Sequence, residues 1–245
     1  MVKILAFDTT NEFMSVAISK NSEILAHKFI KEVGKQAQLI VPTIEELLNK
    51  VGIWYQDLNA VSLTTGPGSF TGVRVGMSVA KGIRVATNLK VICMTCFEIL
   101  TFPYCFNNEK KLGGSLKVAV VMDARQGNLF IQMFNACGSV ITKPKIIKKD
   151  DIAELLQNVL ENSSDTNNEV LLVGSGKNIA KKLLMNSLKL GIKTNLSIDV
   201  STNEDLLDAK NIALLGYKKY EKSEFCSNIR PLYLRSPRVC KRKNK

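Results

Sequence analysis

The feature that most constrains this chain is a repeated pattern, in which an apolar run ends in an aspartate and shorter strand-like runs follow. Residues 2–7 form the first run, which ends at Asp8, and residues 117–122 form the second, which ends at Asp123. The two aspartates lie about 115 residues apart. Near-continuous apolar runs of this length are typical of strands that are buried on both faces of a sheet. Each half of the chain is therefore predicted to open with a buried central strand.

The residues after each central strand repeat a similar order of elements. In the first half we expect hairpin strands at 14–19 and 24–30, a helix from about 39 to 51, a strand at 58–63, a helix to about 86 and a strand at 90–95. Pro42 either begins the first of these helices or kinks it. In the second half we expect strands at 117–123, 129–134, 139–142 and 169–173, with helices after 151 and around 179–184.

This repeat predicts an α/β fold built from two ribonuclease-H-like lobes, as in the actin and sugar-kinase ATPase-like architecture. We expect an N-terminal lobe over residues 1–102, a linker over 103–115 and a C-terminal lobe over 116–200. A last helix is expected over 201–220, because Ser201 and Glu204 have the spacing of a capping box. It is predicted to pack back on the N-terminal lobe. Residues 229–245 have no periodicity and are predicted to form a basic tail.

The 245-residue chain carries a formal net charge of +12, which favours acidic partners, with nucleic acid first among them. This charge is unevenly spread, because residues 230–245 contain seven Lys and Arg and no Asp or Glu. Residues 1–229 keep a net charge of only +5. The folded body is therefore modestly basic, and the tail is expected either to contact RNA beside a partner or to be solvated and inert.

The single histidine, His27, excludes any metal site that needs two imidazoles, and no catalytic motif surrounds it. Among six cysteines only Cys93 and Cys96 form a C-x-x-C pair, so the two pairs of a zinc ribbon are absent. This pair lies in an apolar, β-rich run, and both thiols are predicted to be buried and structural. We expect neither a signal peptide nor a membrane span, and a reducing cytoplasm is the simplest compartment.

A glycine-rich segment at residues 66–76 is the most distinctive motif. It matches neither the dinucleotide fingerprint nor a P-loop, because Val73 and Arg74 stand where a P-loop has Lys and Ser or Thr. Four small residues, Gly68, Gly72, Gly76 and Ala80, lie four apart and share one helix face. Each interior glycine costs a helix about 1 kcal/mol relative to alanine, so this row needs a compensating close approach. Physical reasoning leaves open whether another chain or this chain's own sheet makes that approach.

Three turns could carry chemistry. Asp8, Thr9 and Thr10 follow the first strand, where ATPases of this architecture hold magnesium and phosphate. The corresponding turn of the second half contains Arg125, which suits an anion or a salt bridge better than a metal ion. Residues 174–177 (Gly-Ser-Gly-Lys) look like a P-loop but lack its first glycine and its final Ser or Thr, so we interpret them as a strand-to-helix turn.

Four segments, residues 7–10, 66–76, 123–127 and 231–235, occur in an order and at spacings typical of one family. They resemble the YeaZ family, the bacterial TsaB-type proteins of tRNA threonylcarbamoyladenosine biosynthesis. The resemblance covers residues 2 to about 236, and the glycine segment is its most specific part. Two features depart from the family pattern. Residues 35–42 lack the histidine that many relatives carry in the first helix, and the extension after Arg235 is longer and more basic.

The resemblance implies a non-catalytic subunit that dimerises with TsaD, the related subunit that transfers threonylcarbamoyl to N6 of adenosine 37 in tRNAs reading ANN codons. It implies the ATPase TsaE as a further partner and tRNA as a partner through the complex. No catalytic residue, metal or cofactor is expected on this chain alone, although the complex would use ATP and magnesium. The partner surface, carried onto this chain, comprises Gly68, Ser69, Phe70, Gly72, Val73, Gly76, Met77 and Ala80. The resemblance favours an intermolecular contact for the glycine row.

Two other functions are kept as alternatives. One is an active actin-fold, ATP-dependent phosphotransferase that uses Asp8, Thr9 and Thr10, which would otherwise be a vestigial nucleotide site. The other is a bare nucleic-acid-binding module, although the sequence has no aromatic stacking motif or helix-turn-helix signature. The sequence also leaves open a homodimer through the glycine face.

Overall fold

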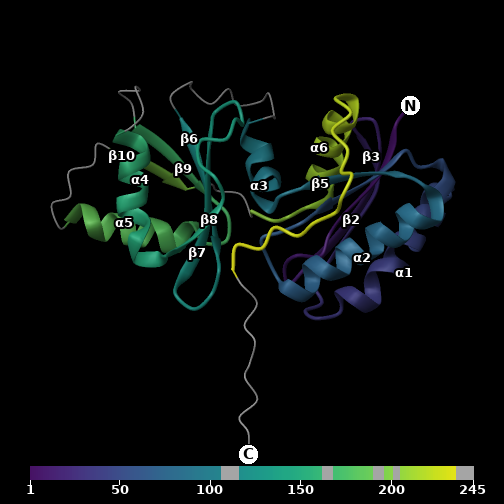
Figure 1. The fold of residues 1–245 in the computed structure, drawn as a ribbon, viewed down its shortest axis with the longest axis horizontal. Coiled ribbons are helices and arrows are strands. Elements are labelled where there is room, and N and C mark those ends of the chain that lie inside the picture. The colour runs from purple at the N-terminus through teal and green to yellow at the C-terminus, as the bar shows by residue number, and fades with distance from the viewer. Residues whose placement is uncertain (106–115, 162–167, 190–195, 201–204, 236–245) are drawn as a thin grey trace, which may run out of the picture.

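The computed structural model describes residues 1–105, 116–161, 168–189, 196–200 and 205–235, and it contains one five-stranded mixed sheet in each half (Figure 1). The first sheet has the order β3-β2-β1-β4-β5, with strands β1 Lys3–Asp8, β2 Met14–Lys20, β3 Glu23–Ile30, β4 Ala60–Thr64 and β5 Lys90–Met94. The second has the matching order β8-β7-β6-β9-β10, with strands β6 Lys117–Asp123, β7 Asn128–Asn135, β8 Lys145–Lys148, β9 Asn168–Val173 and β10 Leu196–Val200. In both sheets the central strand is antiparallel to the next strand and parallel to the fourth. The predicted repeat and the fold class are confirmed.

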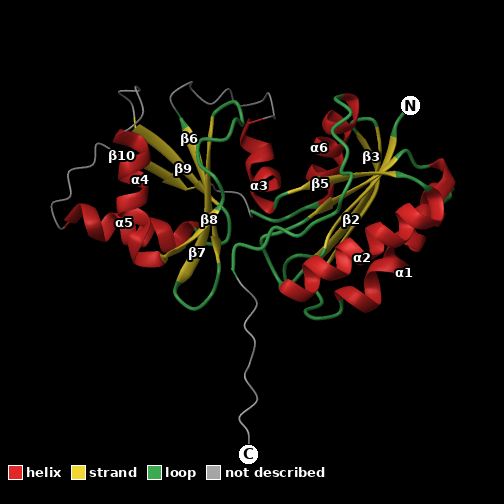
Figure 2. Ribbon diagram, viewed as in Figure 1, coloured by secondary structure: helices red, strands yellow, loops and turns green. Residues whose placement is uncertain are grey.

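The α-helices lie against these sheets (Figure 2). They are α1 Gln36–Val51, α2 Phe70–Thr87, α3 Cys96–Cys105, α4 Ile152–Glu161, α5 Lys177–Lys189 and α6 Ala209–Glu221, with short 3₁₀ turns at Tyr55–Asp57 and Lys149–Asp151. Pro42 lies inside α1, which begins six residues before it at Gln36. Ser69 caps α2, because its side chain accepts a hydrogen bond from the Gly72 N–H. No helix in the ranges that the structure describes is long and apolar enough to cross a membrane.

Alternation along each central strand sends apolar side chains to both faces of its sheet. In β1, Leu5 and Phe7 pack in the cluster under α1 and α2, whereas Ile4 and Ala6 pack in a cluster with α6. β6 repeats this arrangement, because its residues alternate between the cluster of α4 and α5 and the cluster of α3. Both faces are covered, which explains why the two strands are apolar throughout.

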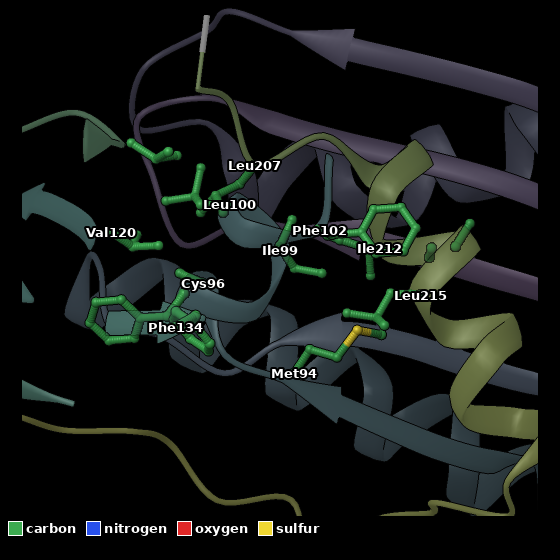
Figure 3. Close-up of a cluster of buried hydrophobic side chains, with 14 of the residues drawn as sticks. Met94, Cys96, Ile99, Leu100, Phe102, Val120, Phe134, Leu207, Ile212 and Leu215 are labelled. Atoms are coloured by element: carbon green, nitrogen blue, oxygen red, sulfur yellow. The ribbon is translucent and has the colours of Figure 1, made fainter. Parts of the chain in front are cut away.

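The two lobes share one continuous core. A single buried cluster joins Ile92 and Met94 of the first sheet to Val120 and Phe134 of the second through α3, and Figure 3 shows Met94, Val120 and Phe134 together with side chains of α3. Helix α3 was not expected from the sequence, and it includes Pro103, the first residue of the predicted linker. The rest of that linker, residues 106–115, lies outside the described residues. The lobes are therefore held together by packing as well as by their chain connections.

Two element boundaries differ from the predictions. Helix α6 begins at Ala209 rather than at Ser201, because Asp208 has extended backbone and its side chain accepts the Lys210 N–H. As predicted, α6 packs on the first sheet. The third strand of the second half lies at Lys145–Lys148 rather than at 139–142, where Val140 makes only an isolated bridge to Phe134 after a turn.

From the end of α6 the described chain returns along the first lobe, and its last described residues lie between the lobes (Figure 1). We call residues 226–235 the C-terminal strap. The Cys226 N–H donates to the Val91 carbonyl at 2.7 Å, and the Leu232 N–H donates to the Thr65 carbonyl at 2.8 Å. Ile229 is buried. Residues 229–235 of the predicted basic tail form no helix or strand, but they pack along the first lobe, and the remainder of that tail, 236–245, lies outside the described residues.

Candidate functional site

The turn after β1 is closed around the Asp8 carboxylate. Asp8 and Thr10 are buried, and Asp8 Oδ1 accepts hydrogen bonds from the Thr10 hydroxyl (2.7 Å) and the Thr10 N–H (3.2 Å). The Thr64 hydroxyl at the end of β4 donates to the same oxygen. Burial raises the pKa of Asp8 to about 6, although the Thr64 and Thr10 hydrogen bonds oppose this rise. The Asp8 carboxylate therefore accepts its hydrogen bonds from groups of its own chain.

This arrangement does not fit the magnesium and phosphate site of an ATPase. The Thr9 hydroxyl also turns inward, and it donates to the Gly72 carbonyl at 2.8 Å. Of the three residues proposed for a vestigial nucleotide site, Asp8, Thr9 and Thr10, only Thr10 lines the cleft between the lobes. The prediction that the three side chains lie close together is correct, but they form hydrogen bonds within the protein instead of facing a ligand.

The glycine row of α2 packs directly on this turn. A Cβ on Gly68 or Gly72 would collide with the backbone carbonyl of Thr10 or Thr9, and one on Gly76 would lie 2.5 Å from Thr9 Oγ1. The Ser69 N–H also donates to the Thr10 carbonyl at 2.6 Å. Of the two interpretations left open, the internal contact accounts for these three glycines.

The partner surface expected from the resemblance therefore needs correction. Gly72, Val73, Gly76, Met77 and Ala80 are buried, because they face the β1–β2 turn and the apolar cluster under α2. This burial leaves them little surface for a contact with another chain. Gly68, Ser69 and Phe70 are exposed, and they stay candidates for a contact.

The outer face of α2 and its neighbour α1 is the surface that the glycine row leaves free. Its exposed positions on α2 include Thr71, Arg74, Ser78 and Gly82, and those on α1 include Ala37 and Val41. At Gly82 nothing lies within 4 Å of the place where a Cβ would be. A glycine inside a helix lowers the stability of that helix. At Gly82 no close approach within this chain compensates for that loss. We call these six residues the α1–α2 face.

An aromatic cluster lies at the N-terminal end of α2. The rings of Phe70 and Tyr233 stack with their centroids 5.2 Å apart, and both side chains are 40% exposed. The Arg74 guanidinium lies 3.7 Å from the centre of the Phe70 ring, and its Nε donates to the Tyr233 hydroxyl at 3.0 Å. Sequence reasoning did not find this cluster. The 231–235 motif was the only signal, and its packing against α2 depends on a contact between distant parts of the chain.

A cleft of about 1110 Å³ separates the lobes. It is lined by the β1–β2 turn, the start of α2, the β6–β7 turn and the C-terminal strap. Arg125 and Gln126 have positive φ angles of 59° and 54°, so the β6–β7 turn folds tightly. Arg125 forms an ion pair with Glu12 across the cleft at 2.7 Å, in agreement with the salt bridge considered for it.

The remaining motifs hold the structure together. Residues 174–177 form the predicted turn between β9 and α5, and Lys177 Nζ pairs with Asp205 at 2.7 Å. Both side chains of this pair are mostly buried, at 16% and 4% exposure. The Tyr104 hydroxyl donates to the other Asp205 oxygen at 2.8 Å. This polar cluster fixes the second lobe to α3 and to the segment before α6.

His27 lies on strand β3, as predicted, and it docks the start of α6. Its Nε2 lies 2.8 Å from Asp208 Oδ1 and 3.1 Å from Ser15 Oγ. Because serine and aspartate meet the same ring nitrogen, they cannot form a relay through the imidazole. Within the described ranges, no group of three or more His, Cys, Asp or Glu residues is arranged to hold a metal ion.

The C-x-x-C pair is split between two elements. Cys93 lies in β5, whereas Cys96 is the first residue of α3, so the prediction that both lie in a β run is wrong for Cys96. Cys96 is fully buried and lies 3.3 Å from the Thr10 hydroxyl. Cys93 is only half-buried and faces Cys226 of the strap instead.

Comparison with known proteins decides the family. The family model for TsaD, tRNA N6-adenosine threonylcarbamoyltransferase, matches residues 24–239 of this chain. The chain belongs to the TsaD family. Within it, the chain is a TsaB- or YeaZ-type member, as the sequence motifs indicated.

Relatives of this type align over different lengths. The TsaB protein of Buchnera aphidicola subsp. Baizongia pistaciae is 28% identical over 94% of this chain and 97% of its own length. The TsaB protein of Escherichia coli is 31% identical over 53% of each chain, so the match spans about half of that protein. Both are described as tRNA threonylcarbamoyladenosine biosynthesis proteins.

Solved structures agree on the fold. YeaZ from Pseudomonas aeruginosa superposes with a TM-score of 0.72 at 21% identity, over 96% of this chain and 100% of that one. A putative N-acetylmannosamine kinase from Listeria monocytogenes superposes with a TM-score of 0.54 at 11% identity, over 90% and 100% of the two chains. The second likeness places the fold in the sugar-kinase architecture that the repeat predicted.

Proposed function

We propose that this chain is a non-catalytic scaffold subunit of a complex that forms threonylcarbamoyladenosine at position 37 of tRNAs reading ANN codons. Its catalytic partner would be a TsaD-type subunit, with a TsaE-type ATPase and tRNA joining through the complex. One observation carries the non-catalytic part of the proposal. The side chains of Asp8, Thr9 and Thr10, which would serve a nucleotide in an active enzyme of this fold, bond instead to one another and to Thr64 and Gly72.

The α1–α2 face is the surface that we assign to the partner. Apart from Arg74, its exposed side chains are small or apolar, so a second pair of helices can approach the backbone closely. Gly82 supports this assignment, because it weakens the isolated helix by about 1 kcal/mol and contacts nothing in its own chain. The aromatic cluster of Phe70, Arg74 and Tyr233 borders this face and offers the residue types that dominate protein interfaces.

The test is co-purification with a TsaD-type subunit. Ser78→Arg places a long charged side chain on the outer face of α2, where Ser78 is exposed. Asn186→Arg makes the same kind of change at an exposed position of α5 in the second lobe, and it serves as the matched control. Both variants should fold, because neither position is buried.

We expect Ser78→Arg to weaken the complex at least tenfold and Asn186→Arg to leave its affinity within twofold of the parent chain. Equal affinity for both variants would contradict the assigned face. Substitutions of Gly72 or Gly76 are unsuitable for this test, because they would clash with the β1–β2 turn of the same chain. Size-exclusion chromatography of Ser78→Arg alone would also show whether a homodimer uses this face.

A further inference from the structure

Two cysteines from distant parts of the chain meet where the C-terminal strap begins. Cys93 lies in β5, and Cys226 lies beside that strand, because its N–H donates to the Val91 carbonyl at 2.7 Å. The Cys93 and Cys226 side chains interact, and this interaction raises the pKa of Cys93 and lowers the pKa of Cys226. Both thiols are half-buried, so they are neither sealed in the core nor freely mobile.

The surroundings of Cys226 favour its thiolate. The hydrogen bond from Cys93 lowers the pKa of Cys226 most, and the positive charges of Lys219 and Arg84 lower it further against the opposing effect of burial. Arg84 is held in place, because its guanidinium donates to the Cys226 carbonyl at 3.4 Å and to the Ser227 carbonyl at 3.0 Å. A thiolate is the nucleophilic form in thiol–disulfide exchange.

We propose that Cys93 and Cys226 form a reversible, redox-active pair that closes to a disulfide and ties the C-terminal strap to β5. The oxidant is a small disulfide such as oxidised glutathione. The inference rests on the contact between the two cysteines and does not depend on the partnership with TsaD.

The exchange balances in two steps. In the first, the Cys226 thiolate attacks one sulfur of the small disulfide, forms a mixed disulfide and releases one small thiolate. In the second, the Cys93 thiol loses its proton to solvent, and its sulfur attacks the Cys226 sulfur and releases the second small thiolate. Two protein thiols are oxidised, and one small disulfide is reduced to two thiols.

The contact also explains the order of these steps. The hydrogen bond to Cys226 is the largest cause of the raised pKa of Cys93, with burial second. Cys93 therefore stays protonated while Cys226 is a thiolate. Once Cys226 is joined to the small thiol, its negative charge is gone, and Cys93 can lose its proton more readily.

A disulfide between these two cysteines would affect the position of the C-terminal strap. The strap carries Leu232, which bonds to Thr65, and Tyr233, which stacks on Phe70 at the start of α2. A bond at Cys226 would fix the beginning of this segment to the sheet. We therefore expect oxidation to protect the strap from trypsin at Arg235.

The test uses the full chain, equilibrated with oxidised and reduced glutathione at varied ratios. Thiols are then blocked, and the unreduced digest is analysed by mass spectrometry. We expect a Cys93–Cys226 cross-linked peptide that becomes the main Cys226 species under oxidising conditions and disappears on reduction. Trypsin cleavage at Arg235 should slow at least fivefold in the oxidised chain.

Matched variants separate this proposal from general thiol reactivity. Cys93→Ser should leave Cys226 as a glutathione adduct, and Cys226→Ser should leave Cys93 largely unmodified. Cys137→Ser removes an exposed cysteine elsewhere and should keep the cross-link. The proposal is overturned if the folded parent chain yields only glutathione adducts at Cys226, or if the cross-link forms only in urea.

Discussion

At the residue scale, Asp8 is a buried carboxylate around which the turn after β1 closes. Its pKa is raised by burial to about 6 in the folded chain, against about 3.8 when unfolded. The folded state therefore binds the proton more readily, and the favourable contribution is complete below pH 3.8 and lost as the pH rises through 6. The loss amounts to at most about 3 kcal/mol at neutral pH.

This pH dependence of stability yields a prediction for Asp8→Asn, which keeps the shape of the side chain and is neutral at every pH. We expect the variant to be at least as stable as the parent chain at pH 7.5. We also expect a flatter dependence of unfolding free energy on pH between 4 and 7. Urea unfolding at four pH values measures both quantities. If the unfolding free energy of Asp8→Asn depended on pH as strongly as that of the parent chain, the raised pKa of the buried Asp8 carboxylate would be contradicted.

Two glycines of α2 give a second prediction at this scale. Gly76→Ala places a Cβ 2.5 Å from Thr9 Oγ1, so overpacking should destabilise the chain by about 1–3 kcal/mol. Gly82→Ala meets open space and should stabilise it by about 0.5–1 kcal/mol through helix propensity. Thermal unfolding of both variants checks the difference. Equal effects would mean that the glycine row does not pack on the β1–β2 turn.

At the element scale, the sequence was most informative where both faces of a strand are buried. The apolar runs ending at Asp8 and Asp123 predicted β1 and β6 because those strands lie inside their sheets. The run around Val140 was misassigned, because a turn decides that boundary. Helix α6 is capped by Asp208, and the cap predicted from Ser201 and Glu204 lies outside the described residues. Helix α3 was missed, since its mostly apolar sequence, residues 96–102, follows directly from a strand and has no helical period of its own.

The start of α6 gives a prediction for an element boundary. Asp208 accepts the Lys210 N–H and pairs with His27. Burial acts to raise its pKa, but the hydrogen bond from His27 and the cap lower it below the ordinary value overall. Its contribution is thus present above the unfolded pKa and lost as the pH falls through the folded pKa.

Asp208→Ala should cost about 1–2 kcal/mol at pH 6, because the cap and the contact with His27 are both removed. Asp208→Asn should retain most of the cap and lose mainly the ionic part of the contact. Chemical denaturation at pH 6 and pH 3 measures the unfolding free energies of the two variants and of the parent chain. A cost for Asp208→Ala that stays the same at both pH values would contradict the ionic role.

At the scale of the whole molecule, the duplicated topology was predictable and the functional surface was not. The repeat of apolar runs predicted two lobes, since each sheet follows the same pattern of burial. The α1–α2 face and the aromatic cluster depend on which side of α2 meets the β1–β2 turn, and on a strap that arrives from the other end of the chain. Helical spacing identified the glycine face, but it could not say whether that face points inward.

The central claim is that this chain supports tRNA modification through its surface and not through an active site of its own. The most direct measurement is the rate of threonylcarbamoyladenosine formation in a reconstituted system with TsaD-type and TsaE-type subunits, tRNA, ATP and a threonylcarbamoyl donor. We predict that Asp8→Asn keeps the rate within twofold of the parent chain, whereas Ser78→Arg lowers it at least tenfold. The account would be contradicted if Asp8→Asn abolished modification while the variant still folded and still bound its partner.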